Sequence, residues 1–330
     1  MTGPSVDGVL VEWGERLFYP SKRIVDSRET PLRFSVAQRA AVIRDHIRAT
    51  VVRRAPQVMV KVTGGGRGMA AIAAHFRYIA KGGRLPFEDD RGVVNEGKEA
   101  LRDLAWQWQH GGSYIGETSH RREAFNIMLS MPNGVDAVTV QRAVREFAAV
   151  ELRDHAWVMV LHDHQANPHV HLSVRAENRH GQRLNPRKAD LQRWRETFAE
   201  KLRGQGIEAE ATRQATRGQD RNYEPLWRIK ATEAGRSTSA RESSKSSPAS
   251  ERSRRQALEA WANIALGLAD SDVPGDRDMA QSVEQYVRTI PFVRTRGLVA
   301  DEAPVRPEVT ADRGPSREVV PTPRSRERGR

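Results

Sequence analysis

The spacing of apolar and polar positions divides the chain into three stretches. Residues 1–54 mix short apolar pieces with many charges and end in an expected helix over 35–52, so we interpret them as a peripheral segment. Residues 55–229 alternate between strand-like and helix-like periodicities, which is typical of a folded domain. Residues 230–330 are rich in Ser, Arg, Glu and Pro, a composition that buries too little apolar surface to offset ordering. We expect a largely disordered basic tail there, with room for a short helix near 256–270.

The central stretch favours an α+β fold. Its apolar patterns predict strands over 57–62, 125–131, 156–162 and 169–176, and helices over 69–83, 98–110, 137–152 and 189–206. The last two strands follow each other directly, and helices separate the others. This order predicts a central antiparallel sheet covered on one side by helices.

The overall charge of the chain indicates a polyanionic partner. Lys and Arg number 54 against 42 Asp and Glu, a net charge of +12, which favours nucleic acid as a partner and leaves a membrane surface as the alternative. No run approaches the roughly 20 apolar residues of a transmembrane helix, and no signal peptide is evident, so we expect a cytoplasmic protein. Because the chain has no cysteine, any metal ion must be held by His and carboxylate side chains.

Histidines gather at the two adjacent strands. Side chains alternate across a strand, so His169 and His171 project from one face while Val170 projects from the other. His162 ends the preceding strand, and a short connection can bring it alongside. The pattern predicts that His162, His169 and His171 hold a divalent ion with coordination positions left open. His164 ranks behind these three as a ligand, and the alternative is a solvated His-rich loop.

Tyr78 is the tyrosine whose position draws attention. In the helix over 69–83 the large apolar residues form a seam, and Tyr78 lies nearly opposite to it. Arg67 and Lys81 share its side of the chain, and such cations favour a nearby phosphate or a phenolate. From this helix alone, an ordinary half-exposed tyrosine is the favoured interpretation of Tyr78.

Three ordered blocks between about residues 56 and 218 resemble the relaxase (mobilisation nuclease) family, which includes the T-DNA border endonuclease of plant-transforming bacteria. The blocks are "PQVMVKVTGGGRG" with "FRYIAKGGRL", then "FNIMLSMPNG", then "HDHQANPHVHLSV". The resemblance implies a ferredoxin- or RRM-like nuclease core with Tyr78 as nucleophile, Ser130 beside the DNA, and a Mg²⁺ or Mn²⁺ ion bound by His162, His169 and His171.

The resemblance also implies a reaction and partners. Tyr78 would nick single-stranded DNA at a transfer origin, form a 5′-phosphotyrosine link and later religate the strand. Accessory mobilisation proteins and a type IV secretion coupling protein would be partners, and the protein would travel to the recipient with the DNA. The basic end of the chain fits an export signal and carries Arg324, Arg326, Arg328 and Arg330, although such a tail is more often a solvated or DNA-binding arm.

The site departs from the family pattern at one position. Relaxases commonly have Asp two residues after the first histidine, whereas this chain has His164 there and Asp163 just before it. The second-shell partner or general base therefore stays open among Asp163, His164, Glu177 and Asp154. An all-imidazole set suits Zn²⁺ or Mn²⁺ better than Mg²⁺, so Zn²⁺ is an alternative ion.

A basic segment after the histidine strands is a further candidate for DNA binding. We expect Arg187, Lys188 and Arg193 to contact phosphates, with Arg67 and Lys81 near the tyrosine. Trp194 could stack on a base, but a place on the buried side of its helix is the favoured interpretation.

Two other functions stay open. A replication-initiator nuclease uses the same chemistry but is expected to carry a helicase segment or a second helical tyrosine, and we find neither. A non-catalytic, metal-containing DNA-binding accessory protein is the other alternative.

Overall fold

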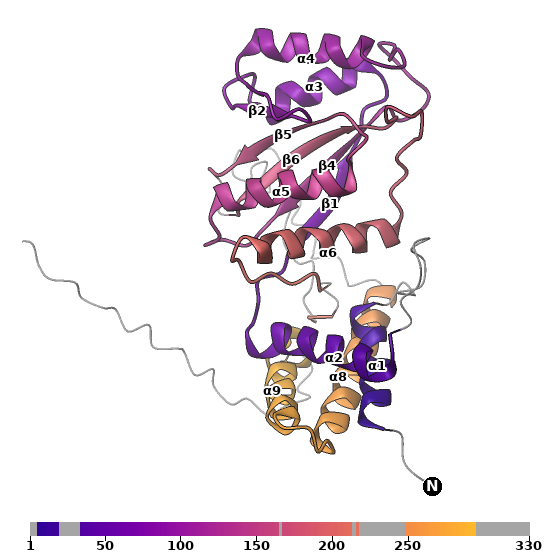
Figure 1. Cartoon of the computed structure of the whole chain (residues 1–330), viewed down its shortest axis with the longest axis vertical. Coiled ribbons are helices and arrows are strands. Elements are labelled where there is room, and N and C mark those ends of the chain that lie inside the picture. Colours follow the sequence, from indigo (N-terminus) through magenta and orange to yellow (C-terminus); the bar gives the residue numbers. More distant parts are fainter. Residues whose placement is uncertain (1–4, 20–33, 165–166, 213–215, 218–247, 295–330) are drawn as a thin grey trace, which may run out of the picture.

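A six-stranded antiparallel sheet forms the centre of the computed structural model, which describes residues 5–19, 34–164, 167–212, 216–217 and 248–294 (Figure 1). The strands follow the order β1-β4-β6-β5-β2-β3, and each neighbouring pair is antiparallel. Their bounds are β1 Met59–Gly64, β2 Phe87–Asp89, β3 Val94–Asn95, β4 Ala124–Ser130, β5 Trp157–His162 and β6 His169–Arg175. The α+β class predicted from the sequence is confirmed.

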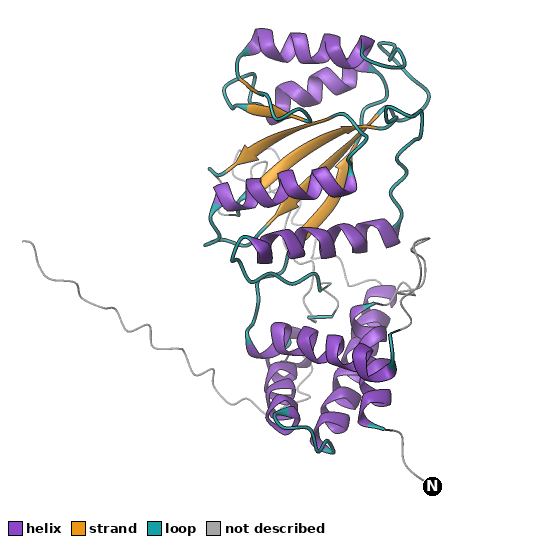
Figure 2. Ribbon diagram, viewed as in Figure 1, coloured by secondary structure: helices purple, strands orange, loops and turns teal. Residues whose placement is uncertain are grey.

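Helices cover both faces of this sheet (Figure 2). On one face α5 (Ala137–Glu151) and α6 (Lys188–Gly204) share a core with apolar residues of β1, β4 and β6. On the other, α3 (Met69–Ile79) and α4 (Lys98–His110) share a second core with β2 and β5. The expectation of helices on one side only was wrong.

The reason lies in the apolar run of β5. Trp157 and Met159 belong to the first core, whereas Val158 and Val160, which alternate with them, belong to the second. A continuous apolar run is the pattern of a strand buried on both faces, whereas strict alternation of apolar and polar residues indicates a strand with one face exposed to solvent.

Strands β2 and β3 were not predicted from the sequence. Their residues include the acidic Glu88 and Asp89, which are nevertheless buried. The Glu88 carboxylate accepts hydrogen bonds from the guanidinium of Arg145 on α5, with Nη2 at 2.7 Å from Oε2. A strand is normally recognised in a sequence by alternating apolar residues. Here a buried position is filled by an acidic side chain paired with a distant helix, so that pattern is missing.

The two ends of the chain together form a helical unit with its own core. It contains α1 Val6–Phe18, α2 Val36–Ile47, the π-helix η1 Arg48–Val52, α8 Pro248–Ala269, α9 Asp276–Thr289 and α10 Pro291–Arg294. Trp261 of α8 is fully buried in this core and packs edge-on to Phe18 of α1, with ring centroids 5.8 Å apart. Neither end could bury its apolar face alone.

This unit differs from the expected peripheral segment and disordered tail. The short helix expected near 256–270 overlaps the longer α8, and two further helices follow it. Two segments lie outside the described residues: the Ser-rich stretch before 248 and the basic end after 294. The second includes Arg324, Arg326, Arg328 and Arg330. Among the described helices, none is both long and apolar enough to cross a membrane.

Candidate metal centre and nucleophile

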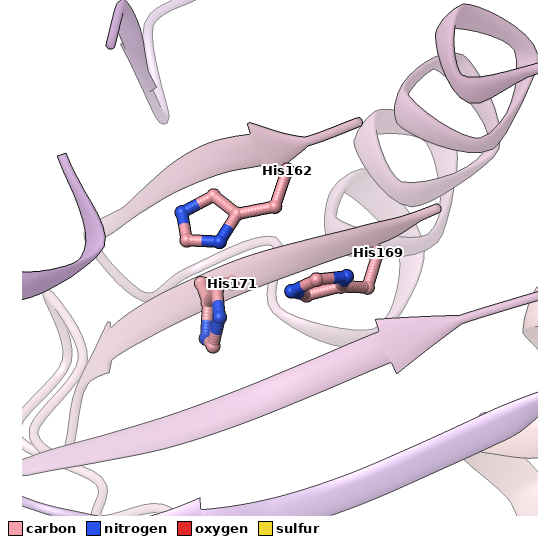
Figure 3. A group of neighbouring side chains, drawn as sticks. All are labelled: His162, His169 and His171. Atoms are coloured by element: carbon pink, nitrogen blue, oxygen red, sulfur yellow. The ribbon is translucent and has the colours of Figure 1, made fainter. Parts of the chain in front are cut away.

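The β5–β6 pair brings the three predicted histidines together (Figure 3). His162 and His169 are direct partners in the antiparallel register, and His171 follows His169 on the same face. The ring centroids are 4.6 Å apart for His162 and His171, 5.0 Å for His162 and His169, and 5.1 Å for His169 and His171. One ligand atom from each ring lies within 4.8 Å of the others, a spacing that one ion can bridge.

Backbone carbonyls hold two of these rings in one orientation. Nε2 of His162 lies 2.7 Å from the carbonyl oxygen of Ile79, and Nδ1 of His169 lies 2.9 Å from that of Asn167. A carbonyl only accepts, so each of these nitrogens carries the hydrogen and donates it. Nδ1 of His162 and Nε2 of His169 are thereby left with a lone pair, the arrangement found behind metal-ligating histidines.

Burial favours the neutral form of the His171 and His162 rings. It lowers the pKa of His171 to about 3, with the neighbouring His162 and His169 acting in the same direction. Burial also lowers the pKa of His162, against the effect of its hydrogen bond to Ile79. Neutral imidazoles with free lone pairs fit a divalent ion.

The end of α3 lies against this cluster. Its last residue, Ile79, supplies the carbonyl that holds His162. The chain then leaves the helix through Lys81, which is left-handed at φ +49°, and Gly83 at φ +89°. A Cβ on Gly83 would meet the backbone of Gly97 at 2.6 Å, so only glycine fits this turn.

Tyr78 lies beside the histidines, one residue before the carbonyl that anchors His162. Its side chain is 71% exposed, and its ring centroid is 6.4 Å from that of His171. The two residues come from α3 and β6, so only the packing of the helix on the sheet makes them neighbours. The structure thus places an exposed tyrosine ring next to a three-histidine cluster.

His75 joins this group and was missed in the sequence. Its ring stacks on Tyr78 with centroids 6.2 Å apart and stands edge-on to His171 at 6.5 Å. Nε2 of His75 is buried and has no hydrogen-bond partner, and burial lowers the pKa of the ring to about 4. Its position three residues before Tyr78, on a neighbouring part of the helix surface, is the signal that could have revealed it.

Residues 90–207 match the family model described as "Relaxase: MobA/VirD2-like, nuclease domain". This part of the chain is similar to relaxase nuclease domains. The resemblance stated from the sequence is confirmed over these residues, and the family implies an endonuclease of mobilisation systems that binds single-stranded DNA. Relaxases generally use a divalent metal ion, and the matched residues include all three clustered histidines. No curated protein matches the chain.

The residues predicted to support the histidines or to act as general base separate into two groups. Asp163 and His164 are exposed next to the cluster, and the His164 ring lies 5.2 Å from that of His162. Glu177 follows the far end of β6 and pairs with Arg183 at 3.3 Å. Asp154 precedes β5, also far from His162. The strand direction therefore removes Glu177 and Asp154 from the neighbourhood of the histidines.

Ser130 is close to the histidine cluster, but its hydroxyl is hydrogen-bonded to the backbone. It is the direct partner of His169 in the β4–β6 register, and it is 4% exposed. Its hydroxyl donates to the carbonyl oxygen of Pro168 at 3.1 Å. In this arrangement the serine holds the turn that leads into β6.

The basic residues predicted to bind DNA lie on two sides of the sheet. Lys81 is at the end of α3 near Tyr78, and Arg67 precedes the helix and donates to the carbonyl oxygen of His120 at 3.1 Å. Arg187, Lys188 and Arg193 belong to the α6 region, which covers the opposite face of the sheet. Arg193 also pairs with Glu151 and Asp190. The structure does not bring the α6 cations to the histidines.

Trp194 is buried in the core under α6, with 1% of its surface exposed. The favoured interpretation, a core residue and no stacking platform, is confirmed.

Proposed function

We propose that this relaxase domain nicks and religates one DNA strand at a transfer origin, with Tyr78 as the nucleophile. The observation that carries the proposal is the exposed Tyr78 ring 6.4 Å from His171, a residue of the three-histidine cluster. A hydroxyl that solvent and substrate can reach, beside a cluster able to hold a cation, is the pair of groups that phosphodiester transfer needs.

The proposed reaction is a transesterification. The Tyr78 hydroxyl oxygen bonds to phosphorus and loses its proton to the surroundings. The bond between phosphorus and the 3′ oxygen breaks, and that oxygen takes up a proton to become a free hydroxyl. One phosphoester link replaces another, so the reverse attack by a 3′-hydroxyl can restore the strand without ATP.

His162, His169 and His171 would hold the cation in this proposal. When bound, a divalent ion would stabilise the negative charge on the phosphate oxygens as the bond to Tyr78 forms. Because neutral imidazoles contribute no charge, they would leave the positive charge of the ion undiminished. The family resemblance favours Mg²⁺ or Mn²⁺, whereas three nitrogen donors suit Mn²⁺ or Zn²⁺ better.

The role in conjugative mobilisation adds partners to the proposal. Accessory mobilisation proteins would deliver the origin, and a type IV secretion coupling protein would receive the nicked strand with its attached protein. The family match and the net charge of +12 support this role, while the basic end of the chain lies outside the described residues.

The test compares the wild-type protein with Tyr78→Phe on a labelled single-stranded origin oligonucleotide in Mn²⁺. We expect a covalent protein–DNA adduct in denaturing electrophoresis for the wild type and none for Tyr78→Phe. Tyr114→Phe is the matched control, because Tyr114 is similarly exposed at 66% and the substitution removes its hydroxyl while keeping its ring, so the adduct should remain. An adduct formed by Tyr78→Phe would refute the assignment. A wild-type protein that binds metal and DNA but never cleaves would favour the accessory-protein alternative.

A further inference from the structure

Three aromatic rings form an exposed row at the end of α4, and we call Trp106, His110 and Tyr114 the aromatic row. Trp106 is 63% exposed and Tyr114 is 66% exposed. The Trp106 and His110 ring centroids are 4.8 Å apart at 30°, and His110 and Tyr114 are 5.7 Å apart. The fold does not need these rings, because Trp108 on the same helix is buried and supplies the core contact.

Cations lie beside the aromatic row. Trp106 lines an open hollow of about 430 Å³ between α3 and α4, together with the exposed Arg77 and Arg102. Neither guanidinium has an acidic partner among the residues that the structure describes. Glu117 also lines the hollow, where Gln109 donates to it at 3.3 Å. Flat rings next to free positive charges suit a ligand with exposed bases and a phosphate backbone.

A buried arginine, Arg175, holds the loop that carries Tyr114. Arg175 of β6 is 4% exposed, and its Nη1 donates to the carbonyl oxygens of Trp108 at 2.6 Å and Gly111 at 2.8 Å. Its Nη2 donates to that of Ser113. The aromatic row is therefore tied to the strand that also carries His169 and His171. Such anchoring preorganises a binding surface relative to the histidine cluster.

Helix α3 lies between the aromatic row and the histidine cluster. Arg77 faces the hollow, and the next residue, Tyr78, faces the histidines, since successive residues of a helix differ by about 100° in direction. A strand with one phosphate at Tyr78 can therefore continue around α3 to the aromatic row.

We propose that the aromatic row binds bases of single-stranded DNA by stacking, while Arg77 and Arg102 contact the adjacent phosphates. The direction of the strand past Tyr78 rests on the proposed function, but the stacking surface does not. A duplex hides the faces of its bases, so the row discriminates single strands from duplex. Stacking is tolerant of sequence, so the row adds affinity on top of any readout of the origin.

Equilibrium binding tests this directly on the full chain carrying Tyr78→Phe, with a chelator present so that no cleavage contributes. The probe is a fluorescent single-stranded oligonucleotide of mixed sequence, read by anisotropy. Trp106→Ala should weaken binding about tenfold and Trp106→Phe much less, because a base stacked on an aromatic ring contributes roughly that factor. Leu266→Ala is the control, since Leu266 on α8 is equally exposed at 67% and should leave the affinity unchanged.

The same titrations with duplex DNA separate stacking from charge. Trp106→Ala should leave duplex binding unchanged, whereas Arg102→Ala should weaken both and reduce the salt dependence. Equal losses for single strand and duplex, or none for the single strand, would overturn the proposal. Unchanged DNA affinity combined with loss of a dimer in sedimentation would assign the row to a second copy of the chain. Because no cleavage is measured, failure of Tyr78 as nucleophile would leave this result intact.

Discussion

Replacing His75 separates a positioning role from direct action on the DNA. His75→Ala removes two ring contacts, one with Tyr78 at 6.2 Å and one with His171 at 6.5 Å. At about 0.5–1.5 kcal/mol for each aromatic contact, the loss is about 1–3 kcal/mol in all. If half of it is felt in the transition state, the nicking rate falls about two- to tenfold. His75→Phe keeps a ring in the same place and should keep most of the rate.

The stability of the two variants should change in opposite directions. Nε2 of His75 is buried without a hydrogen-bond partner, and such an atom destabilises the fold by about 1–3 kcal/mol. His75→Phe removes that polar atom and should raise the unfolding temperature, whereas His75→Ala should lower it.

The assay is single-turnover nicking at saturating oligonucleotide, with thermal unfolding of each variant measured alongside. Saturation isolates the chemical step from DNA binding, so a positioning residue changes the rate constant more than the apparent affinity. If His75→Phe nicks as slowly as His75→Ala while remaining folded, the ring nitrogen itself acts on the substrate and the positioning argument fails.

Three further perturbations test other parts of the structure. His171→Ala should abolish Mn²⁺ binding measured by calorimetry. His180 is exposed, so His180→Ala is the control and should leave Mn²⁺ binding intact. If His171→Ala still binds Mn²⁺, His171 is not a ligand. Arg145→Met leaves the buried carboxylate of Glu88 unpaired and should destabilise the protein by about 2 kcal/mol in urea unfolding, less than for a fully buried pair because Arg145 is partly exposed. An unchanged midpoint would mean that this ion pair contributes nothing. Trp261→Ala empties the core of the helical unit and should destabilise that unit by about 3–5 kcal/mol with Mn²⁺ binding retained; joint loss of metal binding would show that the two cores do not unfold independently.

The sequence predicted those parts of the fold that depend on local patterns. The central helices and strands have strong periodicity, and the alternation of His169, Val170 and His171 correctly places the two imidazoles on one face of a strand. The approach of His162 followed from the short connection between the two strands. The proximity of Tyr78 depends on how α3 packs, which its own helical pattern does not contain.

The remaining features depend on contacts between distant segments. Glu88 lies in a strand because Arg145, far along the chain, neutralises it there. The end segments fold because α1 and α8 bury each other, and neither sequence alone carries that information. His75 and Trp106 are unremarkable in a helical pattern until their exposure and neighbours are known.

The last turn of α3 couples the proposed nucleophile to the proposed metal ligands. Tyr78 and Ile79 are consecutive residues, and the Ile79 carbonyl fixes the ring of His162 at 2.7 Å. A movement of α3 that displaces Tyr78 therefore also releases the hydrogen bond that orients His162. Since the hydrogen on Nε2 determines that Nδ1 keeps its lone pair, the affinity for the proposed ion would depend on where α3 lies. DNA that contacts Arg77 on the same helix can in this way influence both the hydroxyl and the cation site at once.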